Sequence, residues 1–106
     1  MIKTEFFTNK NGAILGFQIK GHSESAEFGN DIICAAVSSA AYMTANTITD
    51  VIGVCADVFV DEGEMSLAMV EKDALLCRDV MSGFKLHMVA LEEQYPENIN
   101  VNYTEV

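Results

Sequence analysis

The chain has 106 residues and a formal net charge of -10 at pH 7, from 16 acidic and 6 basic side chains. This length predicts one domain with a single hydrophobic core, and the negative charge makes direct binding of nucleic acid unexpected, because phosphates are repelled. The N-terminus has no apolar run typical of a signal peptide, and no other segment is expected to approach the roughly 18 to 20 apolar residues of a membrane span. We therefore expect a soluble, cytoplasmic protein with no contact to a membrane.

The first part of the chain predicts a β-hairpin. Residues 2–8 and 13–20 are rich in β-branched and aromatic residues, and residues 9–12, Asn-Lys-Asn-Gly, have the composition of a turn. In the second run, Phe17 and Ile19 alternate with polar or small neighbours, which is typical of a strand with one face in the core.

The sequence then changes to residues that favour a helix. From Asp31 to about Ile52 it is rich in alanine, and its apolar positions recur at helical spacing. Asn30 or Asp31 is a suitable N-cap, and Gly53 is a suitable C-terminal stop. A helix over residues 31–52 is therefore expected.

The second half of the chain repeats the pattern of two strands and a helix. Residues 54–60 and 65–71 predict two strands joined by the turn 61–64, residues 73–94 predict an amphipathic helix, and residues 98–106 predict a last strand. The expected order is ββαββαβ. This order indicates an α+β domain with two helices packed on a mainly antiparallel five-stranded sheet.

One histidine and one cysteine lie close together around the start of the first helix. If this helix begins at Asn30 or Asp31, Cys34 is in its first turn, where the positive end of the helix dipole favours an anion. An imidazole nearby would stabilise the thiolate further, and such surroundings lower a cysteine pKa from about 8.5 to between roughly 3.5 and 7.5. His22 is in the loop that leads to this helix and is the candidate partner.

Less specific interpretations of these residues remain open. Cys34 alone could be a small buried hydrophobe, His22 alone a solvated loop residue, and Asp31 a helix cap rather than a third catalytic group. Gly21 and Gly29 bracket the loop, and their conformational freedom would let it close like a lid and bring His22 to Cys34. The reactive pair and the packing interpretation are therefore about equally supported by the local pattern.

The other cysteines and the second histidine fit packing roles. Three cysteines without a C-x-x-C motif predict reduced thiols rather than a disulfide framework or a structural zinc site. Cys55 and Cys77 are expected to be core residues, and His87 a boundary or core residue. With only two histidines in the chain, no metal site and no cofactor are expected.

The stretch from Gly21 to Ser38 resembles a known protein family. The pattern G-H-x(6)-G-x-D-I-I-C-A-A-V-S, with Gly21-His22, Gly29 and Asp31 followed by Cys34, is similar to that of the bacterial ribosomal-processing cysteine proteases called Prp. The resemblance extends over the whole chain in length, acidic character and element order. It implies one Prp-like protease domain over residues 1–106.

The resemblance also implies a function and a site. Members of the family are homodimeric cytosolic endopeptidases that remove an N-terminal extension from the large-subunit ribosomal protein numbered twenty-seven, cutting after two aromatic residues. The family's catalytic residues correspond to His22 and Cys34, so Cys34 would attack the scissile carbonyl and His22 would protonate the leaving amine. Possible supporting residues, at motif positions without an assigned role, are Gly21, Gly29, Asp31 and Ser38.

The acidic charge is compatible with two functions. It suits a basic N-terminal segment of a ribosomal protein as a protease substrate. It suits equally a non-catalytic dimeric adaptor that binds a basic ribosome-assembly partner. Only the enzyme explains why His22 accompanies a cysteine at a helix start, and a defined cut in a peptide that carries the extension would distinguish the two.

Overall fold

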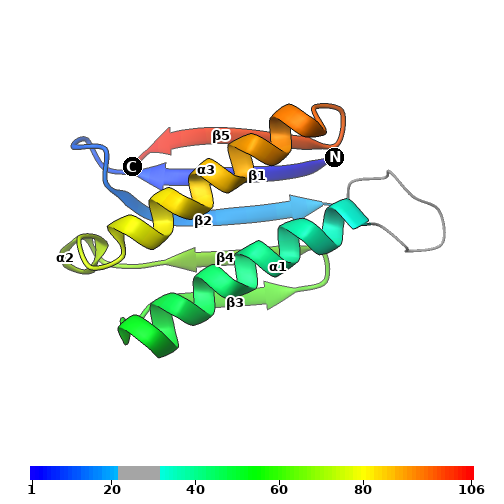
Figure 1. Cartoon of the computed structure of the whole chain (residues 1–106). Coiled ribbons are helices and arrows are strands. Elements are labelled where there is room, and N and C mark those ends of the chain that lie inside the picture. Colours follow the sequence, from blue (N-terminus) through cyan, green and yellow to red (C-terminus); the bar gives the residue numbers. More distant parts are fainter. Residues whose placement is uncertain (22–31) are drawn as a thin grey trace.

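A computed structural model describes residues 1–21 and 32–106 of the chain, and residues 22–31 lie outside the described part. The described residues form a five-stranded sheet with two long helices across one face (Figure 1). This architecture confirms the expected α+β class. The other face of the sheet is not covered by any described helix.

The strands follow the spatial order β3-β4-β2-β1-β5. All neighbouring strands are antiparallel except β1 and β5, which are parallel. The hairpin β1–β2 therefore forms the centre of the sheet and the hairpin β3–β4 extends one side of it. The bounds are β1 Ile2–Thr8, β2 Ile14–Gly21, β3 Asp57–Asp61, β4 Glu64–Ala68 and β5 Ile99–Glu105.

The helices are α1 (Ile32–Asn46), continued by the π-helical segment η1 (Thr47–Ile52), and α3 (Arg78–Gln94), preceded by the single turn α2 (Glu71–Ala74). The end of the first helix agrees with its prediction, since Gly53 has the left-handed conformation of a C-cap, with φ 84°. Its predicted N-cap, Asn30 or Asp31, lies outside the described residues.

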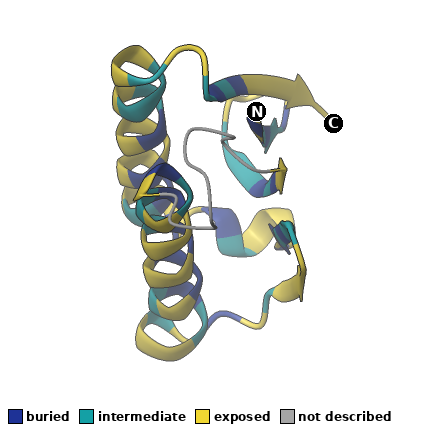
Figure 2. Ribbon diagram, turned by 90° about the vertical axis from the view of Figure 1, so that its right-hand side faces the viewer, coloured by how far each residue is buried: buried dark blue, intermediate teal, exposed yellow. Residues whose placement is uncertain are grey.

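The core lies between the helices and the covered face of the sheet, and its buried residues are coloured dark blue in Figure 2. An aromatic cluster is at its centre. Phe84 of α3 contacts Phe6 and Phe17, with ring centroids 5.6 and 4.8 Å apart, and the rings of Phe6 and Phe17 are 6.4 Å apart. These three rings join α3 to the two central strands.

The second half of the chain differs from its prediction in two places. Strands were expected at 54–60 and 65–71, but β3 and β4 are shorter. β3 begins only at Asp57, because Val54 donates its backbone hydrogen bond to Ile48 at the end of the first helix instead of to a strand. β4 ends at Ala68, and the chain turns into α2 from Glu71. The expected helix 73–94 is interrupted after α2, where tight i to i−3 turns run to Arg78 before α3 begins.

The first helix also corrects an expectation about membrane spans. Ile32–Ile52 form a continuous helical segment of 21 residues with a hydropathy of 1.3, long and apolar enough to cross a bilayer by length and composition. The expectation that no segment approaches this length is wrong, because the Ile, Val and Ala residues keep the mean hydropathy of this helix high despite its Ser and Thr residues. In the folded chain this segment covers the sheet, and its buried residues are Ile33, Val37, Ala41, Thr44, Ala45 and Ile48.

Candidate active site

Cys34 lies at a pocket between the start of α1 and one end of the sheet. It is the third residue of α1 and is half-buried. The pocket has a volume of about 240 Å³, which is smaller than typical sites for drug-sized ligands and suits one or two side chains. Its described lining comprises Ile2, Ile19, Gly21, Cys34, Val37, Ser38, Ala41, Tyr42, Gly63, Glu64 and Met65.

Two stripes of α1 form the helical wall of this pocket. Cys34, Ser38 and Tyr42 are four residues apart, so they lie on one side of the helix and give this wall a thiol and two hydroxyl groups. Val37 and Ala41 are buried beside them and make the deeper part of the wall apolar. The pocket therefore combines a nucleophile and polar groups with an apolar interior.

The sheet provides the opposite wall, where a hydrogen bond joins the end of β2 to the turn between β3 and β4. The backbone N–H of Gly21, at the end of β2, donates a hydrogen bond of 2.9 Å to the carbonyl oxygen of Gly63 in the β3–β4 turn. Both glycines have positive φ, 98° and 71°, which L-residues rarely adopt. A Cβ at Gly21 would also collide with the carbonyl oxygen of Met1. Glycine at position 21 thus shapes the pocket, a role that the sequence motif alone did not assign.

The structure brings together three of the predicted site residues. Gly21, Cys34 and Ser38 line the same pocket, although they come from β2 and α1. His22, Gly29 and Asp31 lie outside the described residues. The lining residues contributed by the β3–β4 hairpin, such as Gly63, carry no local signal and were not predicted, because only strand pairing places them beside Cys34.

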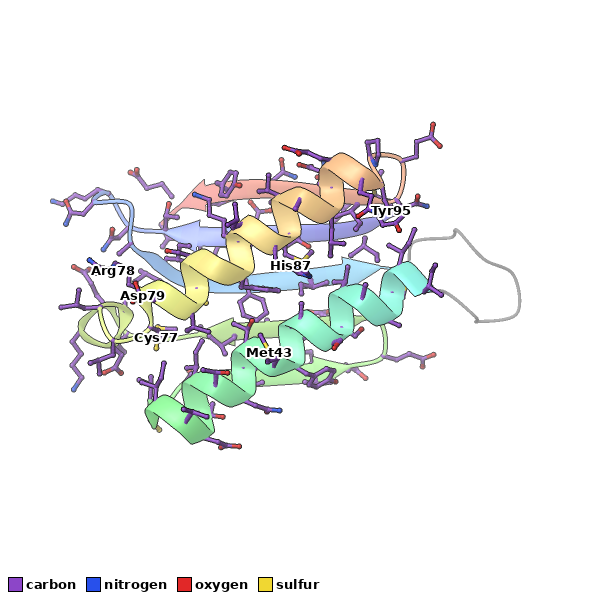
Figure 3. All side chains as sticks on the ribbon, in the orientation of Figure 1. Met43, Cys77, Arg78, Asp79, His87 and Tyr95 are labelled. Carbon is purple, nitrogen blue, oxygen red and sulfur yellow. The ribbon has the colours of Figure 1, made fainter. Side chains whose placement is uncertain are left out.

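The remaining cysteines differ from Cys34 and from each other. Cys77 is buried at the α2 end of the molecule, away from the start of α1 (Figure 3), as predicted. Its burial raises the pKa of the Cys77 thiol, and the carboxylate of Asp73 raises it further. Cys55 is exposed, so its expected place in the core is wrong. It lies in the segment between η1 and β3 rather than in a strand.

The described residues contain no candidate metal centre. Within 1–21 and 32–106, no group of three or more His, Cys, Asp or Glu side chains could hold an ion. His87 is exposed rather than buried and lies on α3 (Figure 3). Cys34 is in the first turn of the other long helix, α1.

The three thiols should differ in their reactivity with iodoacetamide. At about pH 6 to 7 we expect alkylation of Cys34 well before Cys55 and Cys77, because only a thiol with a lowered pKa is ionised there. Exposed Cys55 controls for access, and Cys77 is buried with a raised pKa. Tandem mass spectrometry locates the label, which is necessary because no Lys or Arg separates Cys34 from Cys55. Equal rates for these two cysteines would count against an activated Cys34.

A thiol in the first turn of a helix, beside a pocket for one or two side chains, suits a cysteine nucleophile that attacks a bound substrate. The chain belongs to the cysteine protease Prp family, whose family model matches residues 1–100. It is therefore a cysteine protease, and its family acts in ribosomal processing.

Individual relatives are similar to this chain over almost its full length. The Staphylococcus aureus protein named ribosomal processing cysteine protease Prp is 26% identical over 105 residues, which cover 97% of this chain and 99% of the relative. The crystal structure of the essential S. aureus protease Prp with a covalently linked product peptide matches with a TM-score of 0.90 at 25% identity, covering 98% of this chain and 100% of that chain. The Streptococcus mutans protein SMU.848 has a TM-score of 0.87 at 25% identity, covering 100% of this chain and 96% of the other.

Proposed function

We propose that this protein is the endopeptidase that removes the N-terminal extension of the large-subunit ribosomal protein numbered twenty-seven, with Cys34 as nucleophile and His22 as its acid-base partner. The observation that carries the proposal is the position of Cys34 at a side-chain-sized pocket in a chain of the Prp family. The S. aureus relative was crystallised with a covalently linked product peptide, which fits peptide cleavage through a covalent intermediate.

The mechanism begins with the thiol of Cys34. The positive end of the α1 dipole stabilises its thiolate, which attacks the scissile carbonyl and forms a covalent acyl-enzyme as the amine leaves. His22 donates the proton that the amine needs and then, as neutral imidazole, activates the water that hydrolyses the acyl-enzyme. Support for this role comes from the covalent chain, because His22 is joined directly to Gly21, which lines the pocket of Cys34.

The lining of the pocket supports a preference for apolar or aromatic residues at the cut. Its interior is formed by Ile2, Ile19, Val37 and Met65, all of which are buried in the core. Burying a large apolar side chain contributes roughly 1.5 to 3 kcal/mol. An aromatic side chain next to the scissile bond would occupy this pocket and hold the carbonyl near Cys34.

The acidic surface supports a basic substrate. With a net charge of -10, the protein attracts basic segments such as the N-terminal region of a ribosomal protein and repels nucleic acid. We propose further that the enzyme acts in the cytoplasm as a homodimer, without a cofactor and without contact to membranes or direct binding of nucleic acid. Cytoplasmic action places the enzyme where ribosomal proteins are made.

Cleavage of a synthetic peptide tests the proposal. A peptide that carries the extension and two aromatic residues before the cut should give one defined product by mass spectrometry. Alanine in place of the aromatic residue nearest the scissile bond should lower kcat/KM about 10- to 100-fold, the effect of losing one buried apolar side chain. Binding without any cleavage would instead support the non-catalytic adaptor, and cleavage that ignores the aromatic residues would contradict the role of the pocket.

A further inference from the structure

Strand β3 is an exposed edge of the sheet. It is the terminal strand in the order β3-β4-β2-β1-β5, and among residues 1–21 and 32–106 no strand pairs with its outer side. All five of its residues are exposed, and the three central ones are apolar: Val58, Phe59 and Val60 are 42%, 50% and 49% exposed. An apolar edge of this kind is a template for another extended chain.

The hydrogen bonds of the neighbouring strands show which backbone groups of β3 face outward. Gly21 donates to the carbonyl of Gly63, so the odd-numbered residues on the β4 side direct their backbone groups toward β2. The even-numbered residues therefore bond to β3, where their partners are residues 57, 59 and 61. It follows that the N–H and C=O groups of Val58 and Val60 point to the free edge.

The side chains of β3 have a symmetric pattern. Asp57 and Asp61 stand at the two ends of the strand, on the uncovered face of the sheet together with Phe59, whereas Val58 and Val60 are on the other face. Within the described part of the chain neither carboxylate has a salt bridge to a basic side chain. The edge thus presents an apolar centre between two negative charges.

This pattern disfavours a second copy of the same chain as the partner. If two β3 strands paired antiparallel along their full length, Phe59 would lie opposite its equivalent, and each Asp57 would lie opposite Asp61 of the other copy. Like charges directly opposite each other destabilise a strand pair, and here both ends would carry such a pair. A chain with basic residues at the two ends would form attractive pairs at the same positions.

We propose that β3 is a docking strand for the substrate, which adds to the sheet as a sixth strand through a segment with two basic residues separated by three apolar or neutral residues. The basic residues pair with Asp57 and Asp61, and backbone bonds form with Val58 and Val60. The inference rests on the proposed function, since it assigns a second contact to the same substrate. The strand runs directly into the turn of Gly63, which lines the pocket of Cys34, so one extended peptide can reach both.

A short labelled peptide, Gly-Lys-Val-Tyr-Val-Lys-Gly, tests the docking strand without cleavage. It should bind, and its chemical-shift changes in NMR spectra should centre on residues 57–61. Replacing Asp57 and Asp61 by Asn should weaken binding about three- to tenfold, the effect of two cross-strand ion pairs. The matched control Glu93→Gln with Glu97→Gln removes the same charge from two exposed residues, one in the last turn of α3 and one just after it, and should leave the affinity unchanged.

N-methylated versions of this peptide test the backbone pairing on the unaltered protein. Methylation of alternate peptide N–H groups removes either the donors that face β3 or those that face solvent, depending on which set is chosen. Methylation of the N–H groups that face β3 should weaken binding about fivefold or more, because only these groups can donate to the carbonyls of Val58 and Val60. Methylation of the N–H groups that face solvent should not weaken it. Equal effects of both sets would overturn pairing at the edge.

The remaining outcomes separate the two proposals. Three outcomes would each overturn the docking strand. The chemical-shift changes could be confined to the pocket of Cys34, or the Asp57/Asp61 and Glu93/Glu97 variants could lose peptide affinity equally. The third outcome is a change of the β3 signals with protein concentration, as a dimer forms. Binding at β3 by a protein that cleaves no peptide would refute the proposed function alone. The Asp57→Asn, Asp61→Asn variant and the wild type should also be compared on a cleavable substrate that contains the basic segment. Equal kcat/KM values for the two proteins would refute docking alone.

Discussion

Replacing Cys34 by alanine is expected to abolish peptide cleavage, by at least about a thousandfold in kcat, while the fold and substrate binding persist. The change removes only a sulfur atom from a half-buried position at the start of α1, so little packing is lost. The measurements are product formation by mass spectrometry, substrate affinity and circular dichroism. Cys55→Ala is the matched control, because it removes an exposed thiol and should keep full activity.

Two further variants distinguish a nucleophile from a packing residue. Cys34→Ser keeps a similar shape but supplies a hydroxyl that is far harder to ionise, so it should be nearly as inactive as alanine. His22→Ala should also be inactive with its fold intact. Wild-type cleavage by Cys34→Ala, or failure of all three variants to fold, would remove the support for Cys34 and His22 as a catalytic pair.

Phe6→Ala is expected to give the largest loss of stability, about 3 to 5 kcal/mol in the free energy of unfolding. Phe6 is fully buried on the central strand β1, and its ring contacts those of Phe17, Phe84 and Tyr103. Truncation would leave a cavity that joins three strands and α3. Urea denaturation followed by circular dichroism gives the value.

The neighbouring residue is a control for this loss of stability. Phe7 has the same side chain but lies on the uncovered face of β1 and is only half-buried. Phe7→Ala should therefore destabilise the protein much less than Phe6→Ala. A similar loss in both variants would show that the aromatic cluster between sheet and helices is not the centre of the core.

The elements with strong local signals were predictable from the sequence. The turn at 9–12 forms as expected, with the side chain of Asn9 accepting hydrogen bonds from the backbone N–H groups of Asn11 and Ala13. Gly53 ends the first helix as expected because its positive φ suits glycine. The start of β3 was predicted less accurately, since Val54 bonds to the end of the helix, a contact that no local pattern reveals.

The environments of the cysteines also show what local sequence could predict and what it could not. Cys55 and Cys77 have similarly apolar surroundings in sequence, and both were predicted to be buried, yet only Cys77 is. Cys55 lies in the segment between η1 and β3, whereas Cys77 directly precedes α3 and belongs to the hydrophobic core. Sequence composition cannot separate the two cases.

The sequence by itself determined the class of fold, the order of its elements, the family and the motif that contains His22 and Cys34, because each depends on local pattern and residue identity. Only the tertiary structure decided what surrounds Cys34. Strand pairing over more than forty residues of sequence brings Gly63 to Gly21, and helix packing sets α1 above them, so the pocket exists only once these distant segments meet. The exposed edge of β3 has the same origin, since a strand is terminal only in relation to the whole sheet.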